Sequence, residues 1–303
     1  MRRRALLIAL ALAVCSCARE LDSPPVERAE IRRETDAAAE DAFGALFTVY
    51  ARVLAISERL RLANLELCAD HSGGYFGWMV FAGRDFGSQE MRALAASVVQ
   101  VGEVPVVVAL SPEGPATRAG LQIGDEIMSV GSKRTRTHVQ VRRAEQGQSS
   151  ERATVRFRRA GEEREVAVAP ARACRYEAMP VYAGLGASPT RDGHVGVSIA
   201  LVEEATDNEL AFTLAHSFAL QRLGVDVYSA VVPFPEPQTT NLAVEMCERA
   251  GFDLDDVERL LELEATEQPW GLFLPAKGGG ERVGELPKRI VALRAALARR
   301  AAK

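Results

Sequence analysis

The sequence is short of histidine and of long apolar runs. Only four histidines occur among 303 residues, and no two of them have the spacing of paired metal ligands. No apolar run reaches the roughly 20 residues that a membrane-spanning helix needs. The Gly278–Gly280 run lacks the Lys-Ser or Lys-Thr that would follow it in a phosphate-binding loop. We therefore expect no cofactor and no bound metal.

A strong charge of either sign is also missing. Lys and Arg number 37 against 41 Asp and Glu, which gives a formal net charge of -4. This mildly acidic balance argues against nucleic acid as a partner. Hydrophobic residues make up 48% of the chain, enough for real cores, and the length is typical of two domains rather than one.

The first seventeen residues resemble a bacterial lipoprotein signal peptide. Arg2 to Arg4 form a positive segment, and Ala5 to Val14 is an apolar run too short to span a membrane. The following Val14-Cys15-Ser16-Cys17 resembles a lipobox, which implies lipidation of Cys17 and a periplasm-facing, membrane-anchored protein. Cys15 is the rival acceptor, and an ordinary signal peptide is the alternative. Residues 1–17 would be the leader, and 18–72 a tether and an N-terminal helix.

Three cysteines remain beyond the leader. Cys68 and Cys174 flank the whole middle of the chain, so a disulfide between them would join the two ends of an inserted domain. Cys247 lies in an apolar helical pattern and is predicted to be a buried thiol.

The periodicity of the chain predicts an α+β protein. From Glu27 to Leu67 the pattern is helical, either one long helix or two stacked helices, with one apolar stripe facing a later domain. The predicted strands 104–110, 126–130, 153–159 and 164–168 follow, and the segment 159–162 supplies a hairpin turn between the last two. After residue 174 the pattern becomes mostly helical.

Residues 106–130 carry the most specific motif. Ser111-Pro112, Ala119-Gly120-Leu121 and Gly124-Asp125 lie between two strand patterns, and this order resembles the PDZ domains of bacterial periplasmic proteases. The resemblance implies a β-sandwich-like PDZ module over residues 73–170. Such modules bind extended peptide tails by adding a strand to a sheet edge, while backbone amides hold the terminal carboxylate.

Two segments are candidates for the peptide-binding site that this resemblance implies. Tyr75-Phe76-Gly77-Trp78 matches the apolar-Gly-apolar pattern of the carboxylate-binding loop. The helix over 137–145 would face the peptide with His138, Val139 and Arg142. A purely structural role for Phe76 and Trp78 as core aromatics is the alternative.

The segment 207–220 resembles the metal-binding helix of the HtpX-like zinc metallopeptidases, a family related to the CAAX prenyl endopeptidases. It begins Asp207-Asn208-Glu209-Leu210 and continues to Ala215-His216-Ser217-Phe218-Ala219-Leu220. The resemblance covers about residues 174–300, within an expected domain over 171–303, and implies a zinc site in which two histidines four apart flank a glutamate base.

The residues at these positions do not supply that chemistry. His216 matches the first ligand, but Ser217 replaces the base, Leu220 replaces the second histidine, and Gln238 stands near the third ligand position. Serine is no base near neutral pH, and one imidazole does not hold zinc. We expect a catalytically inactive, peptidase-like scaffold that carries a module for peptide tails or envelope proteins. The alternatives are an active zinc metalloendopeptidase with other ligands, and a structural lipoprotein.

Overall fold

The computed structural model describes residues 27–86, 89, 92–93, 95–96, 101–148, 152–181, 187–189, 194–225, 236–255, 257–259 and 282–302. Cys17 lies outside these residues. The chain divides into two compact units, Met1–Ala39 and Glu40–Lys303. The second unit contains the sheets and every site discussed below.

Helix α2 (Arg28–Ala63) is one long helix, and its part within the second unit has two apolar faces. Leu46, Tyr50 and Leu54 pack with strands of the middle of the chain. Val53 and Leu60 belong instead to the core of the C-terminal region. The expected single stripe is therefore wrong, because the helix is covered by two different partners. The helix ends at Ala63, and Asn64 is the N-cap of the following 3-10 helix η1 (Leu65–His71).

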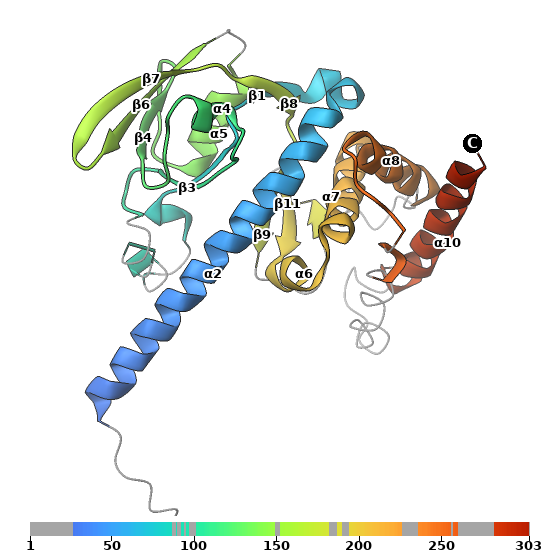
Figure 1. The fold of residues 1–303 in the computed structure, drawn as a ribbon, viewed down its shortest axis with the longest axis horizontal. Helices are drawn as coiled ribbons and strands as arrows, with labels where there is room; N and C mark the ends of the chain where they lie inside the picture. Colours follow the sequence, from blue (N-terminus) through green and yellow to red (C-terminus); the bar gives the residue numbers. More distant parts are fainter. Residues whose placement is uncertain are drawn as a thin grey trace, which may run out of the picture. The chain divides into compact units, whose positions relative to one another are not determined.

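The middle module, defined here as residues 72–174, is built on one antiparallel sheet in the order β2-β3-β4-β6-β7 (Figure 1). The strands are β2 (Trp78–Phe81), β3 (Val106–Leu110), β4 (Glu126–Val130), β6 (Ala153–Arg159) and β7 (Glu162–Val168), and β5 (Lys133–Arg134) pairs with β4. The remaining elements are η2 (Gly83–Asp85), α4 (Pro115–Arg118) and α5 (His138–Gln146). The buried core includes Phe76, Trp78, Leu121, Ile127, Val141 and Val155.

The middle module begins and ends at the same place. Strand β1 (Ser72–Tyr75) pairs antiparallel with β8 (Ala171–Cys174), with Ser72 opposite Cys174. The structure forms the expected disulfide between Cys68 and Cys174, whose Cα atoms lie 5.7 Å apart. Cys247 is free and buried. The hydrogen-bonded pair and the disulfide together hold both ends of the module.

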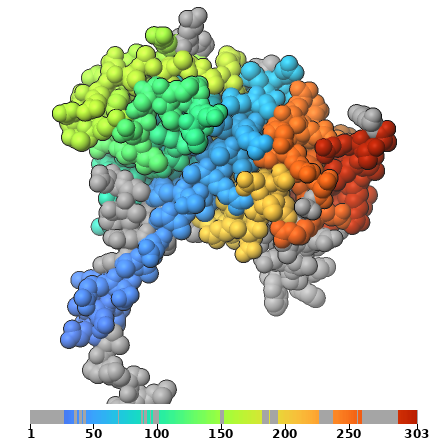
Figure 2. All heavy atoms as spheres, viewed as in Figure 1, coloured from blue at the N-terminus to red at the C-terminus, as the bar shows by residue number. Residues whose placement is uncertain are grey.

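The C-terminal region combines a small sheet with several helices. Strands β9 (Glu177–Val181), β10 (Ala187–Pro189) and β11 (His194–Ser198) form a sheet in the order β10-β11-β9. Helices α6 (Ile199–Glu204), α7 (Asp207–Arg222), α8 (Glu236–Arg249) and α10 (Arg282–Ala301) follow, and α8 contacts both α7 and α10 (Figure 2). Pro237 lies in the first turn of α8, where the backbone N–H that proline lacks has no acceptor within the helix. None of the helices in the described part of the chain combines the length and apolarity needed to cross a membrane.

Candidate functional site

The loop Tyr75-Phe76-Gly77-Trp78 connects β1 to β2 and is shaped by its contact with residues 111–116. Gly77 has a φ of +74°, and a Cβ at this position would lie 2.8 Å from the Cα of Gly114, so only glycine fits. The amide of Ala116 donates to the carbonyl of Phe76 at 2.7 Å, and the amide of Ser111 donates to that of Gly77 at 2.8 Å. The Ser-Pro motif therefore fixes the carbonyls of the loop on one side and leaves the Phe76 amide for another partner.

That partner is the carboxylate of Glu145, in the last turn of α5. The Phe76 amide donates to Glu145 Oε1 at 2.6 Å, and the Trp78 indole N–H donates to Oε2 at 3.0 Å. Glu145 is 7% exposed. Close approach of α5 to β1 depends on Gly74, where a Cβ would lie 2.5 Å from the Glu145 carbonyl oxygen. The loop thus binds a buried carboxylate within its own chain.

The surroundings of Glu145 act on its charge in opposite directions. Burial raises the pKa of Glu145 to about 7, although hydrogen bonds from Trp78 and Phe76 and the charge of Arg61 lower it, and the charge of Glu177 adds to the rise. Arg61 is itself buried, and its guanidinium lies 4.4 Å from the centre of the Tyr75 ring. The carboxyl group therefore titrates near neutral pH while it remains bound to the loop.

The first turn of α5 is held by an aspartate from η2. His138 Nδ1 lies 2.8 Å from Asp85 Oδ1, and the His138 backbone amide donates to Asp85 Oδ2 at 3.2 Å. Burial alone would raise the pKa of Asp85, but hydrogen bonds from His138 and Ala82 lower it, so this carboxyl is ionised at neutral pH. The ring of His138 also lies 6.1 Å from that of His194.

The middle of α5 contacts the small C-terminal sheet. Arg142 Nη1 lies 3.1 Å from Glu177 Oε2 on β9 and 2.7 Å from His194 Nδ1 on β11. His194 Nδ1 is 3.4 Å from the same glutamate oxygen. Burial would raise the pKa of Glu177, but the hydrogen bond and charge of His194 and the charges of Arg142 and Arg61 lower it to about 2. This group is a stable anion that ties α5 to the C-terminal region.

The predicted site residues therefore lie close together, but none of them is freely exposed. Tyr75, Phe76 and Trp78 are buried, and Phe76 and Trp78 belong to the module core. Val139 is half-buried, and all four residues of β2 are buried. Glu145 was missed from the sequence, although its spacing from His138 and Arg142 places the three on one helix face.

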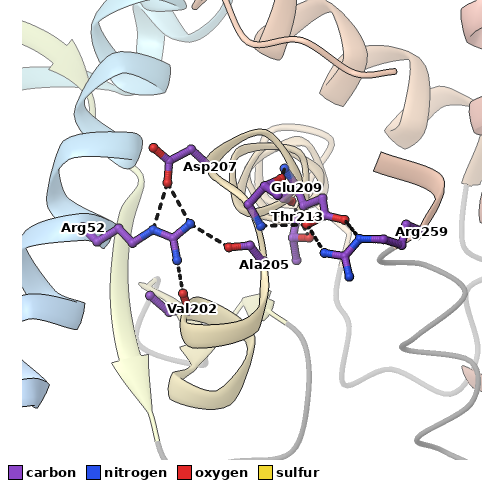
Figure 3. A network of polar contacts seen from close by, with 8 residues as sticks. Arg52, Val202, Ala205, Asp207, Glu209, Thr213 and Arg259 are labelled. Atoms are coloured by element: carbon purple, nitrogen blue, oxygen red, sulfur yellow. Dashed lines mark hydrogen bonds and ion pairs between the residues drawn. The ribbon is translucent and has the colours of Figure 1, made fainter. Parts of the chain in front are cut away.

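The peptidase-like segment forms α7, and its acidic residues hold the start of that helix. Thr206 and Glu209 form a capping box, and the Glu209 carboxylate receives Arg259 Nε at 2.8 Å and Nη2 at 2.7 Å (Figure 3). Asp207 pairs with Arg52 of α2, whose guanidinium also donates to the Ala205 carbonyl at 2.7 Å. Burial would raise the pKa of Glu209, but hydrogen bonds from Arg259 and Thr206 lower it. These contacts position the helix and leave no carboxylate there for another role.

The positions that correspond to the zinc site do not fit a metal. His216, Ser217 and Leu220 are all buried in α7, and the His216 ring centre lies 6.3 Å from that of Phe212. Gln238 is exposed in the first turn of α8. Leu220 supplies no imidazole and Gln238 no carboxylate, so only His216 of the expected ligand set is present. Within the described residues no group of three or more His, Cys, Asp or Glu side chains is arranged to hold a metal ion.

Comparison with known proteins finds a family match within the middle module. Residues 106–159 match the PDZ domain family. The HtrA3 PDZ domain bound to the phage-derived ligand FGRWV is 19% identical, with a TM-score of 0.26 over 34% of this chain and 88% of that chain. The photosystem II D1 C-terminal processing protease is 21% identical, with a TM-score of 0.26 over 34% of this chain and 24% of that chain, so this chain spans about a quarter of its length. A search of the curated proteins found no match. The family match means that the chain contains a PDZ domain.

Proposed function

We propose that this protein binds the C-terminal tails of peptides or partner proteins through its PDZ domain, at the surface of a bacterial membrane. The observation that carries the proposal is the loop at Phe76 and Gly77, which precedes the end strand β2 and whose amide already holds a carboxylate at 2.6 Å. PDZ domains hold a terminal carboxylate with such amides while the tail pairs with the neighbouring strand.

The remaining parts of the proposal concern the location and the C-terminal region. Lipidation of Cys17 would anchor the chain on the periplasmic side of the envelope, and α2 would connect this anchor to the binding module. Residues 171–303 would be a scaffold related to the HtpX-like metallopeptidases that has lost its catalytic set. The donor chemistry at these positions supports this part, because Ser217 replaces the general base, and Leu220 and Gln238 replace two ligands.

Binding of labelled peptides to the full chain tests the central proposal. A pool of fluorescent random hexapeptides with free C-termini is compared with the same pool as C-terminal amides, and we expect retention of the free acids only. Equal retention of acids and amides would contradict recognition of the terminal carboxylate.

Two further measurements test the anchor and the scaffold. Cys17→Ala should release the protein from the membrane fraction, whereas Cys15→Ala should not. The natural chain should neither bind zinc stoichiometrically nor hydrolyse casein in a chelator-sensitive way. Either zinc-dependent result would favour the active metalloendopeptidase instead.

A further inference from the structure

Glu145 occupies the site at which the proposed function needs a peptide terminus. Its two carboxylate oxygens accept from two different donors, the Phe76 amide at 2.6 Å and the Trp78 indole N–H at 3.0 Å. A peptide terminus carries the same group, a carboxylate with two acceptor oxygens. Hydrogen bonds to an ionised acceptor are short and strong, and Glu145 already uses both of these donors.

Glu145 and a peptide terminus would exclude each other. Two carboxylates that share the same two N–H groups lie within a few ångströms and repel one another, and burial strengthens the repulsion. Arg61 supplies positive charge nearby, but its Nε donates to the Cys174 carbonyl at 2.8 Å, and its guanidinium covers the Tyr75 ring. The Phe76 amide and the Trp78 indole N–H can therefore serve one carboxylate, not two.

The residues of the strand beside the loop are also buried. Trp78, Met79, Val80 and Phe81 of β2 are only 4–8% exposed. A peptide that adds a strand needs backbone N–H and C=O groups within reach. The structure is thus a closed state, in which the loop holds an internal carboxylate and β2 is covered.

Building on the proposed tail binding, we propose that Glu145 is an internal competitor for the peptide terminus. A tail binds only after the Glu145 carboxylate has left the loop, and the Phe76 amide and the Trp78 indole N–H then hold the terminal carboxylate. Trp78 is in this way a recognition residue as well as a core aromatic. The partner class is a chain with a free C-terminal carboxylate that reaches the site in extended form.

The test compares the natural full chain with Glu145→Ala. Alanine keeps the helix but removes the competitor and leaves both donors without a partner. With the fluorescent pool of random hexapeptides, we expect the variant to retain at least about tenfold more of the free-acid pool. A tenfold gain corresponds to about 1.4 kcal/mol that the peptide no longer spends on displacing Glu145. The amide pool should be retained equally by both proteins. Glu165→Ala, on an exposed position of β7, is the matched control and should behave as the natural chain.

Two more variants keep the test decisive. Glu145→Gln preserves the shape of the side chain and one acceptor oxygen, so it should show a smaller gain even if Glu145→Ala fails to fold. Adding Trp78→Phe to Glu145→Ala should remove most of the gain, because one of the two donors is lost. If the natural chain and both Glu145 variants retain the free acids equally, the competitor proposal is wrong and tail binding stands. If no folded variant retains the free acids above the amides, both proposals are wrong.

Discussion

Helices α5 and α7 were both selected from the sequence for their polar residues, but different forces hold them in the fold. Along α5, His138, Arg142 and Glu145 follow one face, and each binds a group outside the helix. Along α7, the residues from Glu209 to Leu220 are all buried. His216 and Ser217 lie within this buried run.

The difference shows which of the two helices makes contacts that a ligand could replace. A polar contact between two parts of a chain can be replaced by a similar contact from another molecule, because a ligand can supply the same atoms. An apolar helix that is buried on all sides can be exposed only at the full cost of its burial. A ligand could therefore compete for the contacts that α5 makes, while α7 supports the C-terminal core through its burial.

The largest expected effect is on the α7 side. Phe212→Ala removes a fully buried ring from the C-terminal core and should lower the free energy of unfolding by about 3–5 kcal/mol. Urea unfolding followed by circular dichroism measures this. Leu223→Ala, at a side chain that is 43% exposed, should cost less than about 1 kcal/mol. Equal losses from both variants would mean that α7 is not the support described above.

The next effect is a pH dependence that originates at Glu145. Its pKa is about 7 in the folded chain against 4.5 in the unfolded chain, so the stabilising contribution is complete below pH 4.5 and is lost as the pH rises through 7. The size is about 3 kcal/mol, at roughly 1.4 kcal/mol per pKa unit. Glu145→Gln should flatten the stability profile between pH 4.5 and 8. The other charged or titratable groups that act on this carboxyl or lie beside it are Arg61, Glu177 and Tyr75.

The ion pair between Arg142 and Glu177 should affect the free energy of unfolding at acid pH. Its pH dependence is opposite to that of Glu145, because the contribution is lost as the pH falls. The pKa of Glu177 is about 2 in the folded chain against 4.5, so its contribution is present above pH 4.5 and is lost as the pH falls through 2. Arg142→Met removes one of the cations that lower this pKa. We expect the acid unfolding midpoint to rise, with a loss of about 1–2 kcal/mol at pH 5. Arg143→Met, at an exposed position beside it, should leave the midpoint unchanged.

The smallest effect concerns Ser217, at the position of the missing general base. Among the described residues its hydroxyl has no hydrogen-bond partner, although the side chain is 1% exposed. Ser217→Ala should therefore raise the free energy of unfolding by about 1 kcal/mol. Ser198→Ala is the matched control, because Ser198 is equally buried but caps α6, and it should lose about 1 kcal/mol. A loss of stability in Ser217→Ala would mean that the buried hydroxyl does have a hydrogen-bond partner.

Local signals in the sequence predicted much of the middle module. The strands over 126–130 and 153–159 have the predicted bounds, because alternating apolar residues and the Ala160-Gly161 turn determine them locally. The loop at Gly77 and the pairing of Cys68 with Cys174 could also be predicted. A glycine at a left-handed position and two cysteines at the borders of an insertion are both visible in the sequence.

The chemistry of the site was less accessible, because its partners come from distant segments. Asp85, Glu177 and His194 meet α5 from η2, β9 and β11, and no local spacing connects them. The two apolar faces of α2 could not be predicted for the same reason. The second face is buried only because two different parts of the chain pack on the helix. The strands of the middle module could therefore be predicted from local sequence, whereas the ionic contacts between distant segments could not.

The closed ends of the middle module have a consequence for exchange of domains. The residues between β1 and β8 form an insertion, a side branch of the chain whose two ends lie close together. The Cα atoms of Cys68 and Cys174 are 5.7 Å apart, a distance that two residues can bridge. Topology alone would make this branch removable. Packing opposes removal, because the branch also covers Leu46, Tyr50 and Leu54 on α2. A chain with the branch replaced by a short bridge should still fold but self-associate through this uncovered stripe, which gel filtration over a range of concentrations would reveal. Any module transplanted into this position would have to bring its own apolar cover for α2.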